Sequence, residues 1–517
     1  MNTLTSTQVS PPRAVVIGAG IAGLAMAARL AHAGHRVTVL ERHGWTGGKM
    51  RTLPSQAGPV DTGPTVLTMR HVFERLFHDL GEQLEDHVTL IHQPMIARHF
   101  WPDGSQLDLY DDEARNIDEI TAFAGAKAAQ QFVRFCGHSR TLFDGLEDAM
   151  MQATAPSLPA IATHVLRHPH LIPKLATTMS MARFLSRQFS DPRLAQLFGR
   201  YATYVGGSPY RSPALLSLIW QAEMAGVYAV KGGMHRLAQA ITDLAQARGA
   251  VFQYNAHVAE VLVSEGEATG VRLADGTVHE ADTVVFNGDP RAMATGALGV
   301  ECTSVAPQTV TIPRSLSAEV WAFAATPSGR DLAYHNVFFR TDPKPEFEAL
   351  HAGRRIGDPT IYLCAQDRAG PDAPPTIERF ETIANAPPLT DTPVPQEVPS
   401  CQTRTFQTLQ GFGLSFSPTP DQACLTTPKT WDTLFPATAG SIYGQSPHGM
   451  MAAFQRPTAR TAIKGLYLVG GGAHPGAGVP MATLSAQHAA ETMQHDQIST
   501  SRSRQADMPG GMSMASS

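Results

Sequence analysis

The segment from Ala14 to Glu41 constrains the fold of this chain more than any other, because a strand, a glycine turn, a helix and a second strand follow one another in it. An apolar run of strand length ends at Ile17, and Gly18, Gly20 and Gly23 then stand at the GxGxxG spacing. Glycines at these positions permit a tight turn, the approach of a pyrophosphate and close packing of the helix on the sheet. The segment therefore predicts a βαβ unit that binds a dinucleotide at the helix N-terminus.

The residue that ends the second strand narrows the choice of nucleotide. Arg36–Leu40 alternates as a strand should, and Glu41 follows at close to the spacing of about 20 residues expected of a ribose-binding carboxylate. A free ribose diol can donate hydrogen bonds to Glu41, whereas a 2′-phosphate would be repelled, so NAD and FAD both fit. A transmembrane helix does not fit, because Arg29 and His32 interrupt the apolar run before it reaches about 20 residues.

Length, charge and cysteine content limit the class of protein. At 517 residues the chain is too long for one compact core, so two or three domains are expected. A net charge of −5 argues against a protein that binds nucleic acid by neutralising phosphates. The five cysteines form no CxxC pair, which indicates a reducing compartment, no disulfide framework and no metal site.

Two segments after the βαβ unit carry a resemblance to a known family. Gly47-Gly48-Lys49 follows the second strand, and the segment from Asp61 to Thr65 then reads DTGPT. The flavin-dependent amine oxidase and phytoene desaturase superfamily has a GG(R/K) turn and a DxGPT segment in this order and at this spacing. The chain resembles this superfamily, and the resemblance implies that the dinucleotide is FAD.

A third glycine-rich segment lies near the C-terminus. A strand ends at Gly470 and Gly471, and a second glycine cluster leads into a helix expected over 482–493. The N-terminus of that helix can direct its N–H groups at the flavin, where negative charge accumulates on reduction. The segment from Leu468 to Pro480 resembles the carotenoid desaturase signature LVGxGxHPGxG(I/V)P.

The chain as a whole resembles bacterial carotenoid desaturases of the phytoene desaturase type. Within this group, the segment from Gly63 to Arg70, GPTVLTMR, is most similar to the hydroxyneurosporene (methoxyneurosporene) desaturases of purple bacteria, whereas phytoene desaturases continue GPTVITDP. Phe380–Pro388, Gly440–Gln445 and Phe454–Pro457 also resemble desaturase segments. The resemblance implies an α/β fold in which a Rossmann-like FAD-binding domain carries an inserted substrate domain and a helical membrane-facing cap.

The expected domains follow from these segments. They are a disordered leader (1–12), a discontinuous FAD-binding domain (13–100, 225–295 and 459–493), a helical cap (101–224), a substrate domain (296–458) and a disordered tail (494–517). The resemblance also implies the residues that hold FAD: Gly18, Ala19, Gly20, Gly23, Glu41, Arg42, Gly48, Lys49, Gly63, Pro64, Thr65, Val258, Gly470, Gly471, Gly478, Val479 and Met481.

The implied activity is desaturation of an acyclic carotenoid, with a hydride passed to the flavin and a proton lost from the neighbouring carbon. A long apolar channel must then bind the substrate, and oxygen or a quinone must accept the electrons. Candidates for a general base are His474, Glu147 and Asp148, although the proton can also leave to water. A phytoene desaturase, a carotenoid isomerase, a soluble flavin amine oxidase and a non-catalytic flavoprotein remain as alternatives.

The stretch 149–190 has no acidic residue, while Arg167, Lys174, Arg183 and Arg187 are spaced among apolar residues. Such a cationic and apolar surface suits an anionic bilayer, where each basic residue contributes about 1 kcal/mol. We therefore expect peripheral attachment at the cytoplasmic side of a membrane. The alternative is a helical cap on its own core, with the basic residues merely solvated.

Overall fold

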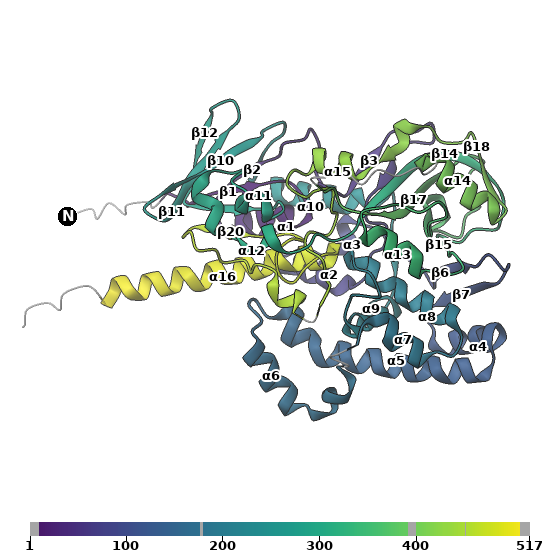
Figure 1. Ribbon diagram of the computed structural model, residues 1–517. Helices are drawn as coiled ribbons and strands as arrows, with labels where there is room; N and C mark the ends of the chain where they lie inside the picture. The colour runs from purple at the N-terminus through teal and green to yellow at the C-terminus, as the bar shows by residue number, and fades with distance from the viewer. Residues whose placement is uncertain (1–9, 176–178, 391–399, 450, 507–517) are drawn as a thin grey trace, which may run out of the picture.

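The computed structural model describes residues 10–175, 179–390, 400–449 and 451–506 (Figure 1). Its N-terminal βαβ unit belongs to a five-stranded sheet in which all neighbouring strands are parallel. In spatial order the strands are β20 (Leu466–Leu468), β13 (Thr283–Phe286), β1 (Arg13–Ile17), β2 (Arg36–Leu40) and β9 (Val251–Gln253). The predicted Rossmann-like sheet is confirmed, and it is assembled from three separated parts of the chain.

Alternate residues of β1 face opposite sides of this sheet, as the pleat requires. Ala14 and Val16 pack into a core with α1 (Ile21–His32), α10 (His235–Ala247) and α16 (Val479–Ala506). Val15 and Ile17 pack on the other side against the three-stranded antiparallel sheet β10 (Val258–Ser264), β11 (Glu267–Leu273) and β12 (Val278–Glu280). The continuous apolar run in β1 therefore reflects a strand that is buried on both faces.

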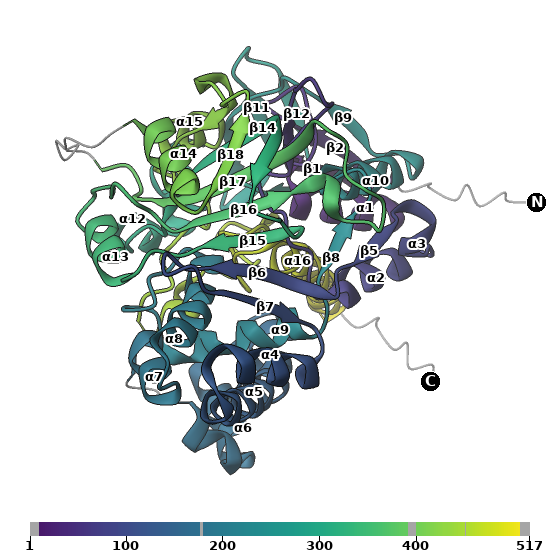
Figure 2. The same cartoon turned by 90° about the vertical axis from the view of Figure 1, so that its right-hand side faces the viewer.

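A second, eight-stranded mixed sheet forms the other half of the molecule (Figure 2). Its order is β18 (Leu414–Ser417), β14 (Ser317–Gly329), β17 (Glu378–Ala386), β16 (Ile361–Ala365), β15 (His335–Phe338), β6 (Met95–Phe100) and β7 (Gln106–Tyr110), with β19 (Leu425–Thr426) beside β14. Because β6 pairs with β15, this sheet takes up residues on both sides of 100. The predicted domain boundary at residue 100 therefore falls between β6 and β7, inside one sheet.

Helices gather beside β7 as one layer in Figure 2, where the sequence predicted a helical cap. They are α4 (Glu113–Ala124), α5 (Ala126–Leu146), a π-helix (Glu147–Gln152), α6 (Leu158–Arg167), α7 (Met181–Gln188), α8 (Pro192–Gly199) and α9 (Ile219–Met224), with 3-10 turns at Pro169–Lys174, Arg200–Val205 and Ala214–Leu218. Phe132, Phe198 and Trp220 lie at the centre of their common core. The cap therefore shares its core with strands β6, β7 and β15 of the eight-stranded sheet, and α6 projects from it (Figure 1).

Shorter elements connect these layers. The strand pairs are β3 (Arg51–Leu53) with β4 (Val60–Thr62), and β5 (Leu90–His92) with β8 (Tyr228–Val230). The remaining helices are α2 (Arg70–Asp79), α3 (Leu84–His87), α11 (Arg291–Ala294), α12 (Gln308–Thr311), α13 (Lys344–His351), α14 (Cys401–Gly411) and α15 (Pro428–Leu434).

The C-terminal helix is longer than expected. It was predicted to end at residue 493, but α16 continues to Ala506, so the described part of the expected disordered tail (494–517) is helical. Residues 1–9 of the expected leader and residues 507–517 of the tail lie outside the described ranges. Within those ranges, the helices all fall short of the length and apolarity needed to cross a membrane.

Candidate flavin and substrate site

The glycine segments meet at Asn287, directly after β13. The Asn287 amide Nδ2 donates to the Gly18 carbonyl oxygen over 3.1 Å. A Cβ atom on Gly20 would come within 2.9 Å of the same nitrogen, and one on Gly470 within 2.8 Å of the Asn287 Oδ1. Segments that lie more than 400 residues apart in sequence are therefore held together at the carboxyl ends of β1, β13 and β20, where open α/β sheets bind ligands.

The first glycine turn leaves no room for side chains. A Cβ atom on Gly23 would stand 2.1 Å from the Gly18 carbonyl oxygen, so only glycine allows α1 to begin this close to β1. The predicted GG turn packs on the same place, because the Gly47 N–H donates to the Ala19 carbonyl over 2.8 Å. Gly48 has φ +59°, and a Cβ there would lie 3.0 Å from the Gly20 Cα.

Glu41 lies beside this turn, as its predicted role requires. Its side chain is buried, with Oε2 accepting from the Ala19 N–H over 2.7 Å and Oε1 from the His43 N–H over 2.8 Å. The Ala256 N–H donates to the Glu41 carbonyl oxygen, which brings Val258 to the same edge of the sheet. The Arg42 Nη1 is buried without a hydrogen-bond partner among the described residues, so it has a donor left for a ligand. The ribose and adenine contacts of these residues stay predictions.

The DTGPT segment is held by two buried carboxyl groups. Asp61 accepts from the Met234 N–H over 2.6 Å at the start of α10, and Glu381 accepts from the Gly63 N–H over 2.6 Å. Burial raises the pKa of Glu381 well above its usual range, and Asp61 raises it further. Glu381 comes from the segment that resembled a desaturase strand, which is β17. Its role in positioning Gly63 was not predictable, because it depends on contact between distant segments.

Two cations link the flavin segments to the GSIYG stretch and its surroundings. Lys49 Nζ donates to the Ile442 carbonyl over 2.6 Å, and burial lowers the Lys49 pKa to about 8. Arg456 Nη1 donates to the Gly471 carbonyl over 2.5 Å, and burial lowers the Arg456 pKa to about 10. Asp289 opposes both shifts. Phosphate contacts of Lys49 stay a prediction.

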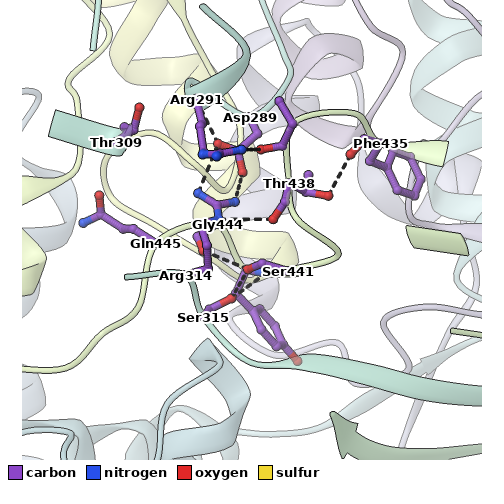
Figure 3. Close-up of polar contacts among 12 residues, drawn as sticks. Asp289, Arg291, Thr309, Arg314, Ser315, Phe435, Thr438, Ser441, Gly444 and Gln445 are labelled. Carbon is purple, nitrogen blue, oxygen red and sulfur yellow. Dashed lines mark hydrogen bonds and ion pairs between the residues drawn. The ribbon is translucent and has the colours of Figure 1, made fainter. Parts of the chain in front are cut away.

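Figure 3 shows the contacts that fix the side chain of Asp289. It forms an ion pair with Arg314, whose Nε donates to the Thr438 carbonyl over 3.1 Å. The next residue, Ser315, hydrogen-bonds Ser441 through its hydroxyl group. This network fixes the 438–445 loop against the segment that follows β13, and thus closes the substrate domain onto the FAD-binding domain.

A cavity of about 1400 Å³ opens between these domains and the helical cap. At one end it is lined by Gly63, Pro64 and Thr65, and by Gly478, Val479 and Met481 at the N-terminus of α16. Its walls are largely apolar, and it extends to the inner side of α6 at Leu158, Ile161 and Val165. Helix geometry leaves the N–H groups of the first turn of α16 without acceptors in the helix, so they can face a bound flavin.

The three candidate bases have different surroundings. His474 lines the cavity, but its Nε2 hydrogen-bonds the Ala153 carbonyl over 2.8 Å and burial lowers its pKa. Glu147 pairs with His71 at 3.5 Å, and Asp148 is exposed beside it. Neither carboxylate is among the described residues that line the cavity, whereas Glu223 is. The structure therefore places only His474 with the predicted flavin contacts, and a catalytic role for any of the three stays a prediction.

The residues fit a dinucleotide of the flavin type. The glycine cradle excludes Cβ atoms, the N-termini of α1 and α16 point at one site, and Arg42 keeps an unpartnered buried donor. With a large apolar cavity at the flavin end, fold and site define a flavoprotein oxidoreductase.

Comparison with known proteins agrees with this class. The family model of flavin containing amine oxidoreductases matches residues 21–494, so the chain belongs to that family and its cofactor is FAD. A hydroxyneurosporene desaturase from Cereibacter sphaeroides is 52% identical, over 95% of this chain and 99% of its own. A 1-hydroxycarotenoid 3,4-desaturase from a Flavobacterium species is 30% identical, over 93% and 98% of the two chains. The fold is similar to that of an oxidoreductase from Methanosarcina mazei (TM-score 0.58, 18% identity, 93% and 100% of the chains).

Proposed function

We propose that the protein is an FAD-dependent desaturase that introduces a C=C bond into an acyclic, hydroxylated carotenoid. The observation that carries the proposal is the cavity, which joins the flavin segments to the helical cap through largely apolar walls. Relatives named as hydroxyneurosporene desaturase and 1-hydroxycarotenoid 3,4-desaturase support this substrate class.

The cavity suits a long hydrocarbon. Its volume of about 1400 Å³ exceeds the roughly 300–1,000 Å³ of pockets for drug-sized ligands. A carotenoid chain offers no polar group along its length, so its binding must come from burial of apolar surface, about 25 cal/mol for each Å². A soluble amine oxidase would need polar contacts for an amine, which this long apolar wall does not favour.

FAD, when bound, supplies the two-electron acceptor for the reaction. The protein's part is to hold two neighbouring substrate carbons beside the Gly63–Thr65 and Gly478–Met481 segments and to exclude water from them. Loss of a hydride leaves positive charge on the substrate, which makes the neighbouring C–H bond acidic. The proton that leaves the second carbon therefore needs only a weak acceptor. His474 is the candidate closest to that role, since its imidazole lines the cavity and burial keeps it neutral.

The substrate would enter from a membrane through the cap. In α6 and the turn after it, Leu158, Leu166 and Ile172 are exposed by 48%, 73% and 52%. Arg167 is exposed at the end of α6, Arg183 and Arg187 are exposed on α7, and the cavity is lined in part by α6. We propose that this surface docks peripherally on an anionic bilayer at its cytoplasmic side. The electrons would then pass to oxygen or to a quinone dissolved in that bilayer.

Product analysis tests the proposal against its rivals. The purified FAD-bound protein is incubated in air with hydroxyneurosporene in vesicles, and the extracted pigment is read by absorbance and mass. A red-shifted product that has lost two hydrogens supports the desaturase. An isomerised product of unchanged mass would identify a carotenoid isomerase, and turnover of amines alone would identify an amine oxidase.

A further inference from the structure

The wall of the cavity carries charged side chains that a plain hydrocarbon would not need. Arg200 and Tyr204 come from the 3-10 turn after α8, and Glu223 comes from α9. All three line the cavity, and only 9% of Arg200 and 2% of Glu223 is exposed. Burying a charged group is costly unless it is paired and hydrogen-bonded, so this cluster requires an explanation.

The hydrogen bonds within the cluster leave it able to donate to and accept from a ligand in the cavity. The Tyr201 hydroxyl donates to Glu223 Oε2 over 2.5 Å. The Arg200 guanidinium lies over the rings of Tyr201 and Tyr204, at 5.4 and 5.0 Å, and its Nε has no hydrogen-bond partner among the described residues. Tyr204 also hydrogen-bonds both Arg200 and Glu223, so the three side chains form one connected polar cluster in the cavity wall. A ligand group that both donates and accepts can join this cluster from the cavity.

This cluster lies near the flavin end of the cavity. Thr65, in the flavin segment, shares a 2.6 Å hydrogen bond with the hydroxyl group of Tyr362, which also lines the cavity. Burial raises the pKa of Tyr362 well above its usual value, and Tyr204 is near enough to raise it further. Tyr362 thus connects the cluster to the flavin segment at Thr65.

The charges of the cluster favour a neutral ligand group that both donates and accepts hydrogen bonds. An added anion would be repelled by Glu223, and an added cation by Arg200. A hydroxyl group can donate to Glu223 while it accepts from Arg200 or Tyr204. A methyl ether can only accept, and a hydrocarbon can do neither, so each would leave part of the hydrogen-bonding capacity of this buried cluster unused.

We propose that Arg200, Tyr204 and Glu223 bind the terminal hydroxyl group of the substrate and thereby choose which end of the carotenoid, and which bond, meets the flavin. The proposal rests on the desaturase function proposed above. It predicts a ranking of substrates in which the hydroxylated carotenoid reacts faster than its methyl ether, and the methyl ether faster than the parent hydrocarbon.

Anaerobic flavin reduction tests the ranking with the FAD-bound protein and three substrates: hydroxyneurosporene, its methyl ether and neurosporene. We expect the wild type to prefer the hydroxylated substrate by about 100-fold or more, because a missing hydroxyl leaves buried groups unpaired. Glu223→Gln and Tyr204→Phe should slow reduction by the hydroxylated substrate about 10- to 100-fold and change reduction by neurosporene less than about twofold. Asp118→Asn, at an exposed position on α4, is the matched control and should leave all three rates unchanged.

Retained FAD content and an unchanged melting temperature establish that each variant is folded, and Tyr204→Phe serves if Glu223→Gln does not fold. Equal losses with all three substrates would mean a merely structural role and overturn the proposal. Equal rates for the three substrates with the wild type would overturn it too. If the wild-type flavin is reduced by none of the carotenoids, the desaturase function itself fails and this proposal falls with it.

Discussion

The side-chain amide of Asn287 donates to the Gly18 carbonyl oxygen over 3.1 Å and so joins the end of β13 to the glycine turn after β1. Its other amide atom faces Gly470, at the end of β20. A single side chain thus contacts all three strand ends at which the dinucleotide is predicted to bind.

Replacing Asn287 with aspartate tests that dependence. Asp keeps the shape but removes the donor, and it turns a carboxylate oxygen toward the Gly18 carbonyl. We expect a loss of about 1–3 kcal/mol in stability, because a buried acceptor is left unpaired, together with reduced FAD content. The ratio of flavin to protein absorbance and the melting temperature measure both effects. A variant that purifies with full FAD and an unchanged melting temperature would refute this role of Asn287.

Glu41→Gln tests the predicted ribose contact. Gln keeps one acceptor for the Ala19 N–H but loses the charge, so we expect FAD to bind about 10- to 100-fold more weakly, as for hydrogen bonds to charged groups. Fluorescence titration of the apoprotein with FAD measures the affinity. Glu265→Gln, in the exposed turn between β10 and β11, is the control. Equal affinities for wild type and Glu41→Gln would show that the carboxylate only braces the turn.

The parts of the site that could be predicted from the sequence are those in which consecutive residues carry the signal. Gly18, Gly20, Gly23 and Glu41 occupy one βαβ unit, so their spacing alone placed them correctly around the turn. Arg200 and Glu223 could not be predicted, because each looks like a solvated residue of an amphipathic helix until the tertiary fold turns it to the cavity.

The domain boundary illustrates the same limit. Residues 95–100 form β6, but their partner β15 lies more than 200 residues further along the chain. The periodicity of apolar residues depends only on residues that are close in sequence. It could therefore not assign β6 to the second sheet. The predicted end of the last helix differs for the same reason, because the Tyr467 hydroxyl donates to Asp496 over 3.0 Å and so joins β20 to α16 beyond residue 493.

Glu346 gives a prediction of pH dependence. It is buried, with 1% exposed, it accepts from the Thr360 hydroxyl over 2.8 Å, and burial raises its pKa from the usual 4.5 to about 7. Between these values the unfolded chain loses the proton while the folded protein keeps it. The stabilising contribution is therefore complete below pH 4.5 and is lost as the pH rises to about 7, by about 3 kcal/mol.

Unfolding of wild type and Glu346→Gln across this pH range measures the contribution. The difference in free energy of unfolding between the two proteins should shift in favour of the variant as the pH rises. Glu348→Gln, at an exposed position on the same helix, should show no such shift relative to wild type. A pH-independent difference for Glu346→Gln would contradict the raised pKa.

Docking on a membrane is tested by flotation with vesicles that contain anionic lipid. Replacing Arg167, Lys174, Arg183 and Arg187 with glutamine should remove most of the binding, since each basic residue contributes about 1 kcal/mol near anionic headgroups. High salt should have the same effect on the wild type. Unchanged flotation of the quadruple variant would contradict membrane docking by these residues. The cap would then be a helical layer whose basic residues are merely solvated.

Anaerobic mixing of the FAD-bound protein with hydroxyneurosporene tests the central claim most directly. Because the desaturation delivers two electrons to the flavin, we predict that the flavin becomes reduced as a red-shifted carotenoid forms in equal amount. An isomerised carotenoid formed without net bleaching, or bleaching by amines alone, would contradict the account.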